Sequence, residues 1–138
     1  MPTAVSLGAL ALVLGWRDRL PDPVATHWGP DGVDELGSLT PAAVWPLGVV
    51  IPAFTLVLAA AAAFLPLTRA HVRGLAASAA GFSVMISGVV TGGFSLQLDL
   101  ADATTAPDIG GPFALSLLAA IAAAGLAAWL VPPPAETG

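Results

Sequence analysis

The sequence predicts an all-α integral membrane protein: a four-helix bundle with an ordered extracytoplasmic loop between its first and second helices. Of its 138 residues, 57% are hydrophobic and only 9% are charged, whereas a typical soluble domain carries about 25% charged residues. The apolar residues fall into long runs rather than alternating with polar ones, which is typical of membrane spans. We therefore interpret residues 1–138 as a single membrane domain whose first partner is the lipid bilayer.

Four apolar runs cover residues 3–16, 41–65, 74–97 and 112–131. The last three are long enough to cross a hydrocarbon core of about 30 Å at about 1.5 Å per helical residue. The first would reach only about 21 Å, which predicts either a helix that thins the bilayer locally or one that begins further upstream. A cleaved signal peptide is the alternative for this run, but no basic region precedes it and no small-residue cleavage site follows it.

Prolines and tryptophans mark particular positions in these runs. Pro46 and Pro52 fall inside the second run, where they are expected to kink the helix because each removes a backbone donor. Trp16, Trp45 and Trp129 lie near run ends, as residues that anchor a helix at the membrane interface do. No ionisable residue lies inside the second, third or fourth run, which argues against a proton relay or an ion-coupled transporter.

The third run carries a face of small residues. These are Ser83, Ser87, Gly88, Thr91, Gly92 and Ser95. Small residues let helix backbones approach closely, and hydroxyls can form hydrogen bonds across the contact. We expect Ser87, Gly88, Thr91 and Gly92 to serve helix packing within the bundle. Homodimerisation and a polar pathway are the alternatives.

The arginines indicate the orientation in the membrane. Arg17 and Arg19 follow the first run, whereas Arg69 and Arg73 lie between the second and third. The positive-inside rule therefore gives a tie, which the N-terminal amine tips toward cytoplasmic N- and C-termini in a multi-pass protein of the cell membrane. Every carboxylate except Glu136 then lies in the two outer loops.

Composition also excludes several kinds of partner and cofactor. The formal net charge of −5 and the absence of lysine argue against nucleic-acid binding and against a polybasic lipid-binding patch. The absence of cysteine excludes disulfides and thiolate metal sites. We predict no cofactor.

The segment between the first two runs, residues 17–39, is called the acidic cap below. Its sequence "GPDG" from Gly29 to Gly32 predicts a tight turn, in which Pro30 presets φ and Gly32 permits positive φ. Pro21 and Pro23 hold the preceding stretch extended. The acidic cap is therefore expected to be ordered.

Residues of the acidic cap include types that bind metals or perform catalysis. The candidate metal ligands are Asp22, His27, Asp31, Asp34 and Glu35. Their spacing matches neither a calcium loop nor the HExxH helix of zinc enzymes, so we predict no metal site. Ser38, His27 and Asp31 have the residue types of a catalytic triad, but there is no GxSxG elbow. We predict that the protein is not an enzyme, with a metal-dependent membrane enzyme as a distant alternative.

The segment "LPDPVATHWGPDGVDELGS" after a first helix, followed by a proline-containing second helix, resembles the signature of the domain of unknown function 1648. That domain forms the N-terminal part of the SdpI-like bacterial immunity membrane proteins. The matching positions are Leu20, Pro21, Pro23, His27, Trp28, Gly32, Asp34 and Ser38. The resemblance directly covers Met1 to about Leu65, and Leu39 stands where the family usually has lysine. Some members of that family protect a cell from a secreted toxic peptide and sequester a transcription repressor.

Two functional hypotheses follow. In the first, the resemblance implies a non-enzymatic immunity or signalling protein whose 20–38 loop binds an extracytoplasmic peptide or partner protein. Its candidate binding or structural residues are Pro21, Asp22, Pro23, His27, Trp28, Gly32, Asp34 and Ser38. In the second, this loop is purely structural, and the protein is an accessory subunit that docks in a larger membrane complex through residues 74–97.

Overall fold

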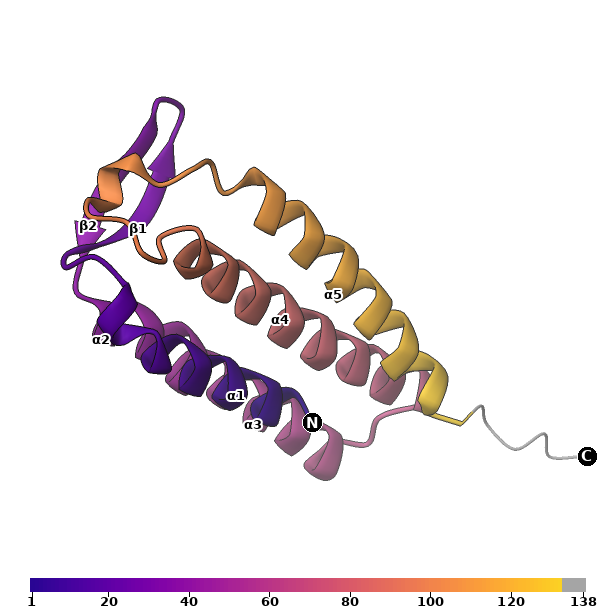
Figure 1. Ribbon diagram of the computed structural model, residues 1–138. Helices are drawn as coiled ribbons and strands as arrows, with labels where there is room; N and C mark the ends of the chain where they lie inside the picture. Colours follow the sequence, from indigo (N-terminus) through magenta and orange to yellow (C-terminus); the bar gives the residue numbers. More distant parts are fainter. Residues whose placement is uncertain (133–138) are drawn as a thin grey trace, which may run out of the picture.

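The computed structural model describes residues 1–132. Its helices are α1 (Pro2–Gly15), α2 (Leu39–Val44), the π-helical segment η2 (Trp45–Val50), α3 (Ile51–Phe64), α4 (Arg69–Ser95) and α5 (Gly110–Leu130). Two strands, β1 (Val24–Gly29) and β2 (Gly32–Gly37), form a hairpin, and short 3-10 turns occur at η1 (Arg17–Arg19) and η3 (Ala103–Thr105) (Figure 1).

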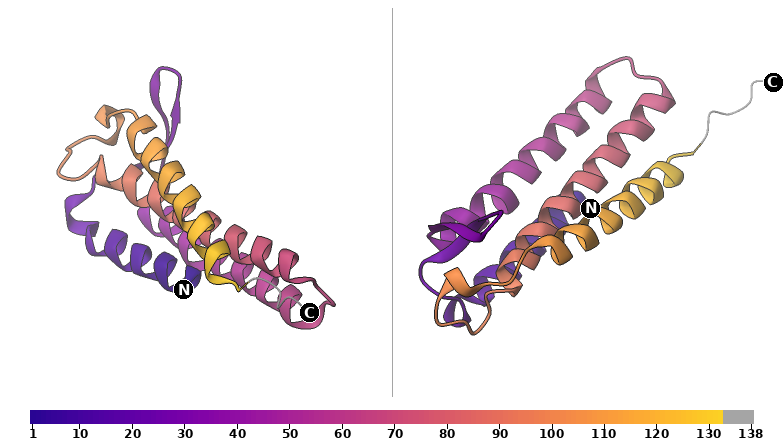
Figure 2. Two further views of the ribbon diagram at one scale, coloured as in Figure 1. Left: turned by 90° about the vertical axis from the view of Figure 1, so that its right-hand side faces the viewer. Right: turned by 90° about the horizontal axis from the view of Figure 1, so that it is seen from above.

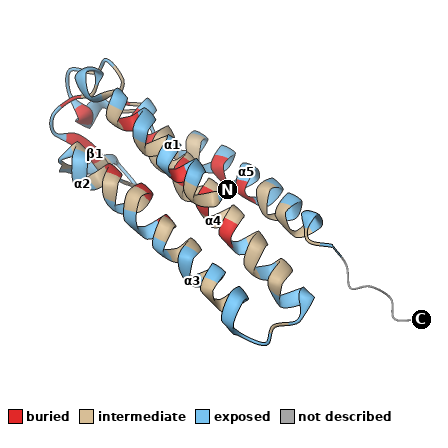
Figure 3. Cartoon of the chain, turned by 90° about the horizontal axis from the view of Figure 1, so that it is seen from below, coloured by how far each residue is buried: buried red, intermediate tan, exposed pale blue. Residues whose placement is uncertain are grey.

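Three helices are long and apolar enough to cross a membrane. They are Leu39–Phe64, Arg69–Ser95 and Gly110–Leu130. These helices correspond to the predicted runs 41–65, 74–97 and 112–131, although the helix that contains the 74–97 run begins already at Arg69. Many of their large apolar side chains, such as Leu56, Phe64 and Leu115, are exposed. Figure 3 shows exposed positions along much of α3 and α5. Such a surface is suited to contact with lipid rather than water. The prediction of a mostly helical chain with four main helices is confirmed, and the three helices of membrane-spanning length support a membrane protein. The predicted run 3–16 forms the shorter apolar helix Pro2–Gly15, which is not among these three.

Helix α1 is shorter than the three helices of membrane-spanning length and covers only part of the bundle. It has 14 residues, and the hydroxyl of Ser83 in the middle of α4 donates a hydrogen bond to the carbonyl oxygen of Pro2 over 2.7 Å. The beginning of α1 therefore lies at half the height of α4, as Figure 1 shows. As a result, α1 packs along the half of the bundle that is nearer to the hairpin.

The second helix runs without a break from Leu39 to Phe64, but its hydrogen-bond pattern changes at the prolines. The π-helical segment Trp45–Val50 contains Pro46, and Pro52 lies at the start of α3. Because proline cannot donate a backbone hydrogen bond, the widened turn accommodates Pro46 within a continuous helix. The predicted disturbance of this helix by its prolines takes the form of a π-helical turn.

The expectation of an all-α chain is wrong within the acidic cap, where β1 and β2 pair antiparallel. The physical reason is local. Val24, Thr26 and Trp28 are β-branched or aromatic residues that favour strands, and the predicted turn at Gly29–Gly32 joins the strands, with Gly32 at a φ of 115°. The pairing is irregular on both sides of His27.

A small core joins the hairpin to the bundle. Val13 of α1, Val24 of β1, Ala43 of α2 and Phe94 of α4 are buried against one another. Apolar residues that are distant in sequence thus meet where four elements converge. Figure 2 shows the hairpin, the loop after α4 and the start of α5 gathered at this same end of the bundle.

Candidate binding site

The acidic cap is tied to the loop that follows α4 by a buried glutamine. Gln97 is fully buried, and its Oε1 accepts a hydrogen bond from the amide of Ala25 over 2.7 Å. Its Nε2 donates to the carbonyl oxygens of Ala25 and Gly93, both over 3.1 Å. A buried amide side chain that satisfies its donor and acceptor groups in this way holds β1 in one position over α4.

An exposed ion pair makes a second connection. The guanidinium of Arg19 donates to both carboxylate oxygens of Asp99, from Nε over 3.0 Å and from Nη2 over 2.5 Å. The amide of Asp99 in turn donates to the carbonyl oxygen of Arg19 over 2.7 Å. The hydrogen bond from Arg19 holds the pKa of Asp99 below its ordinary value. Asp99 itself has a φ of 62°, a conformation that aspartate tolerates better than most residues.

Trp28 makes the third connection. Its indole Nε1 donates a hydrogen bond over 3.0 Å to the carbonyl oxygen of Pro107, which lies between η3 and α5. Its ring also lies close to Gly93 of α4, where an added Cβ would come within 3.5 Å of the indole. The hairpin, the loop after α4 and the helix ends therefore form one connected structure.

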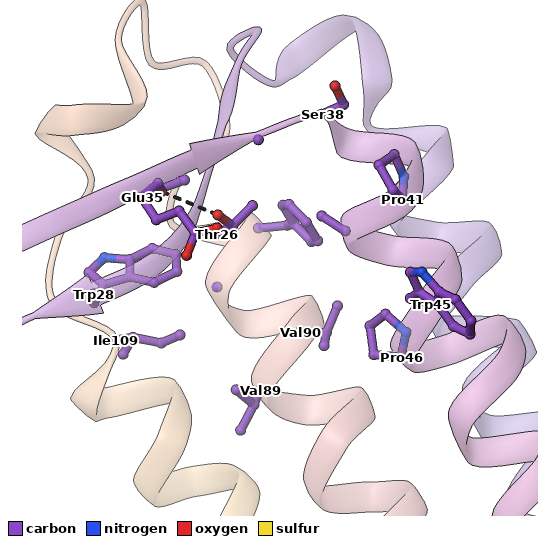
Figure 4. A pocket seen from close by; sticks show the side chains of 15 residues that line it. Thr26, Trp28, Glu35, Ser38, Pro41, Trp45, Pro46, Val89, Val90 and Ile109 are labelled. Carbon is purple, nitrogen blue, oxygen red and sulfur yellow. Dashed lines mark hydrogen bonds between the residues drawn. The ribbon is translucent and has the colours of Figure 1, made fainter.

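A cleft of about 460 Å³ lies between the hairpin, the start of the second helix and α4 (Figure 4). Its lining residues are Ala25, Thr26, Trp28, Glu35, Gly37, Ser38, Pro41, Ala42, Trp45, Pro46, Val89, Val90, Gly93, Phe94 and Ile109. Most of these side chains are apolar, and Trp28, Trp45 and Phe94 are aromatic. A concave apolar surface with a few polar groups is the usual form of a binding site.

Glu35 is the one ionisable residue among those that line the cleft. Its backbone carbonyl accepts a hydrogen bond over 3.3 Å from the hydroxyl of Thr26 on the opposite strand. In Figure 4, Glu35, Thr26 and Trp28 lie on the hairpin side, while Trp45 and Pro46 stand across the cleft on the second helix. The cleft therefore offers a carboxylate beside aromatic and aliphatic walls.

The residues predicted in the acidic cap do not gather at one site. Trp28 and Ser38 line the cleft, whereas His27 and Asp34 lie elsewhere on the hairpin and pair with each other, with His27 Nδ1 at 2.6 Å from Asp34 Oδ1. The hydrogen bond to Asp34, and then its negative charge, raise the pKa of His27 above its ordinary value of 6.5. Gly32 is in the turn between the strands.

The three predicted residues before β1 differ in their exposure. Pro21 is buried, whereas Asp22 and Pro23 are exposed, and the Asp22–Pro23 peptide bond is cis. None of these three residues lines the cleft. Within residues 1–132, no group of three or more histidine, aspartate or glutamate side chains is close enough together to hold a metal ion.

The small residues of the third run pack inside the chain. A Cβ added at Gly88 would collide with Ser116 of α5, and one added at Gly92 would come within 2.5 Å of the Cβ of Pro112. Ser87 is 5% exposed, and its hydroxyl and that of Thr91 have no hydrogen-bond partner in the part of the chain that the structure describes. The two glycines thus allow the close approach of α5 to α4.

Several lining residues were not among the predicted site residues, notably Glu35, Trp45, Phe94 and Ile109. In the sequence, Glu35 has the residue type of a metal ligand, and Trp45 has the position of an interfacial anchor. The alternation of a strand through Thr26 and Trp28 was the available signal, but the irregular pairing at His27 obscures the corresponding position on β2. Phe94 and Ile109 come from distant segments that only the fold brings to the hairpin.

Comparison of the chain with protein-family models, with curated proteins and with solved structures finds no match.

Proposed function

We propose that this protein is a non-enzymatic membrane protein of the SdpI-like kind, whose acidic cap binds an extracytoplasmic peptide or partner protein. The observation that carries the proposal is the cleft between the hairpin and the helices, with Trp28, Trp45 and Phe94 in its walls and Glu35 as its ionisable residue. Aromatic side chains are the residues that most often dominate the energy of a protein interface.

The charge around the cleft indicates the chemistry of the binding partner. Every carboxylate of the described chain lies in the acidic cap or in the loop between α4 and α5, together with two of the four arginines, Arg17 and Arg19, so this end of the bundle carries a net negative charge. Such a field attracts cationic partners and raises their rate of association. An apolar peptide segment with a lysine or arginine fits both the walls of the cleft and the carboxylate of Glu35.

Binding of a labelled peptide tests the proposal directly. The probe is a short peptide of alternating leucine and lysine, and its fluorescence anisotropy is followed as purified protein in micelles is added. Trp45→Ala should weaken binding by more than about tenfold, as truncation of a central tryptophan usually does. Trp129→Ala is the matched control, because Trp129 is exposed on α5 far from the cleft. An equal loss in both variants, or no loss in either, would reject the cleft as the site.

The charge of Glu35 is tested separately. Since Glu35 is exposed, Glu35→Gln should weaken binding of the leucine–lysine peptide by up to roughly fivefold, the range of a solvent-screened ion pair. Asp31→Asn removes the same charge at the tip of the hairpin and should have a smaller effect. If the two variants behave alike, the acidic field attracts the peptide but Glu35 does not contact it.

The orientation of the cap belongs to the same proposal. The turn between α3 and α4 carries Arg69 and Arg73 without any carboxylate, whereas Arg19 in the acidic cap is paired with Asp99. We place the α3–α4 turn on the cytoplasmic side of the membrane. The chain has no cysteine, so Val33→Cys and Ala70→Cys can each be treated in intact cells with a membrane-impermeant thiol reagent. Labelling at position 33 alone is expected, and labelling at position 70 alone would invert the topology.

The accessory-subunit hypothesis has less support. It requires the small residues of α4 to be free for another helix, but Gly88 and Gly92 already pack against Ser116 and Pro112 of α5. A second helix would have to displace α5 to reach them. The cleft is therefore the better candidate for contact with a partner.

A further inference from the structure

A second cavity lies at the opposite end of the bundle from the hairpin. It has a volume of about 650 Å³, is open to the outside of the bundle, and is lined by residues of α3, α4, α5 and the beginning of α1. Representative lining residues are Leu58 of α3, Val72 and Ala76 of α4, and Leu126 of α5. Met1, Pro2 and Val5 also line it, and Pro2 is held beside α4 by the hydrogen bond from Ser83. We call this cavity the lower groove.

The lining of the lower groove suits a hydrocarbon chain. Thr55 and Ser83 are the two residues with polar side chains among those that line it, and Met1 carries the N-terminal amine. The hydroxyl of Ser83 is already used in the bond to Pro2. The walls belong to three helices of membrane-spanning length. An occupant at this depth must be apolar, because polar groups lack partners in the hydrocarbon core. The volume falls within the range of about 300–1,000 Å³ that is typical of ligand sites.

Two arginines of α4 lie close in sequence to Val72, which lines the lower groove, although they are not lining residues themselves. Arg69 and Arg73 are in the first turns of α4, next to the lining residue Val72. Residues three or four positions apart share a helix face, so Arg69, Val72, Arg73 and Ala76 lie along one side of α4. Neither arginine forms an ion pair within residues 1–132, where the ion pairs are Arg19–Asp99 and His27–Asp34. No carboxylate occurs in the sequence between Leu39 and Ser95.

We propose that the lower groove binds one anionic phospholipid, with its acyl chains against α3, α4 and α5 and its phosphate between Arg69 and Arg73. The arginines supply the forked donors that suit a phosphate, and the apolar walls determine where the lipid lies. Basic residues beside a pocket between membrane helices recognise anionic headgroups in this way. The lower groove would bind a single lipid and is not a polybasic surface. It is separate from the cleft beneath the hairpin.

Thermal unfolding in micelles tests the proposal. Phosphatidylglycerol and phosphatidylcholine with identical acyl chains are added to separate samples, and the Tm is measured by circular dichroism. Phosphatidylglycerol should raise the Tm of the wild-type protein by several degrees more than phosphatidylcholine does, because a ligand of the folded state stabilises it. The double variant R69Q/R73Q should lose this difference. Arg17→Gln is the matched control, because it removes an exposed arginine at the other end of the bundle and should keep the difference.

A filled groove provides a second, independent test. Ala76→Phe places a large side chain in the groove and leaves both arginines intact, so native mass spectrometry should find fewer bound phosphatidylglycerol molecules than on the wild type. Equal Tm values in the two lipids, an undiminished difference in R69Q/R73Q, or the same Tm rise with inorganic phosphate would overturn the proposal. So would a dimer in light scattering that is lost in Ala76→Phe, since the groove would then hold a second copy of the chain.

Discussion

The side chain of Gln97 forms with Ala25 the two hydrogen bonds that a neighbouring strand would form. Its Oε1 accepts from the amide of Ala25 over 2.7 Å, and its Nε2 donates to the carbonyl oxygen of the same residue over 3.1 Å. A side chain at the end of α4 thus satisfies the outer edge of β1. Because Ala25 also lines the cleft beneath the hairpin, this pair sets the position of one wall of the proposed site.

Replacement of Gln97 by leucine should loosen the hairpin. Gln97→Leu keeps the volume but leaves the buried amide and carbonyl of Ala25 without partners, at a cost of about 1–3 kcal/mol for each group. Hydrogen exchange at the amides of Ala25 and Thr26 should become faster, while exchange in the middle of α5 should stay unchanged. Ser95→Ala is the control, since the hydroxyl of Ser95 bonds only to Gly92 in its own helix. Unaltered exchange at Ala25 in Gln97→Leu would show that the glutamine does not hold the hairpin.

The pair formed by His27 and Asp34 predicts a pH dependence of the hairpin. The pKa of His27 is raised above 6.5 by its hydrogen bond to Asp34, so the folded state binds a proton more tightly than the unfolded state. The stabilisation is therefore complete below a pH of about 6.5 and is lost as the pH rises through the raised pKa. Proton exchange at the hairpin amides should accordingly show less protection, after correction for the intrinsic rate, at pH values above the raised pKa.

The pKa of His27 can be measured by NMR. In His71→Gln, His27 is the one remaining histidine, so its ring signal can be followed without assignment. Asp34→Asn should return the pKa of His27 toward 6.5, whereas Asp31→Asn should leave it raised. An equal decrease in both variants would assign the shift to the general negative field of the acidic cap rather than to the hydrogen bond.

Asp99 combines an ion pair with a special backbone conformation. Its φ of 62° is accessible to aspartate and asparagine but costly for alanine. Asp99→Asn removes only the charge of an exposed pair and should change the Tm little, since such pairs contribute little to stability. Asp99→Ala should lower the Tm distinctly more. Equal Tm values for the two variants would mean that the backbone conformation at this position carries no cost.

Prediction from sequence succeeded for the long apolar runs and for one turn with characteristic residues, and it failed for the short strands beside that turn. Apolar runs of about twenty residues predict membrane helices because few other structures can bury them, and the "GPDG" turn was evident from Pro30 and Gly32. The strands on either side of the turn are not evident in the sequence, because charged residues and an irregular register at His27 interrupt their alternation. The length of α1 was evident, whereas its position halfway along α4 depends on the contact of Pro2 with Ser83.

The candidate site was predictable only in part, for the same reason. Trp28 and Ser38 belong to the local motif and line the cleft. Phe94 and Ile109 are ordinary apolar residues in sequence, and they acquire a role only because Gln97 and Trp28 tie the hairpin to the loop after α4. Contacts between segments about 70 to 80 residues apart leave no periodic signal in a single sequence.

The close contact of α4 with α5 predicts opposite effects of alanine at two glycines of the same helix. A Cβ at Gly92 would lie 2.5 Å from the Cβ of Pro112, whose ring cannot turn away, whereas a Cβ at Gly74 would meet nothing within 4 Å. Gly92→Ala should therefore destabilise the bundle by about 1–3 kcal/mol through overpacking. Gly74→Ala should stabilise it by up to about 1 kcal/mol, because alanine favours the helix. The measurement is the free energy of unfolding in mixed micelles, followed by circular dichroism. The contrary result is that Gly92→Ala leaves the stability of the isolated protein unchanged and weakens its association with another membrane protein. In that case α4 is a docking helix, and the accessory-subunit hypothesis is the better one.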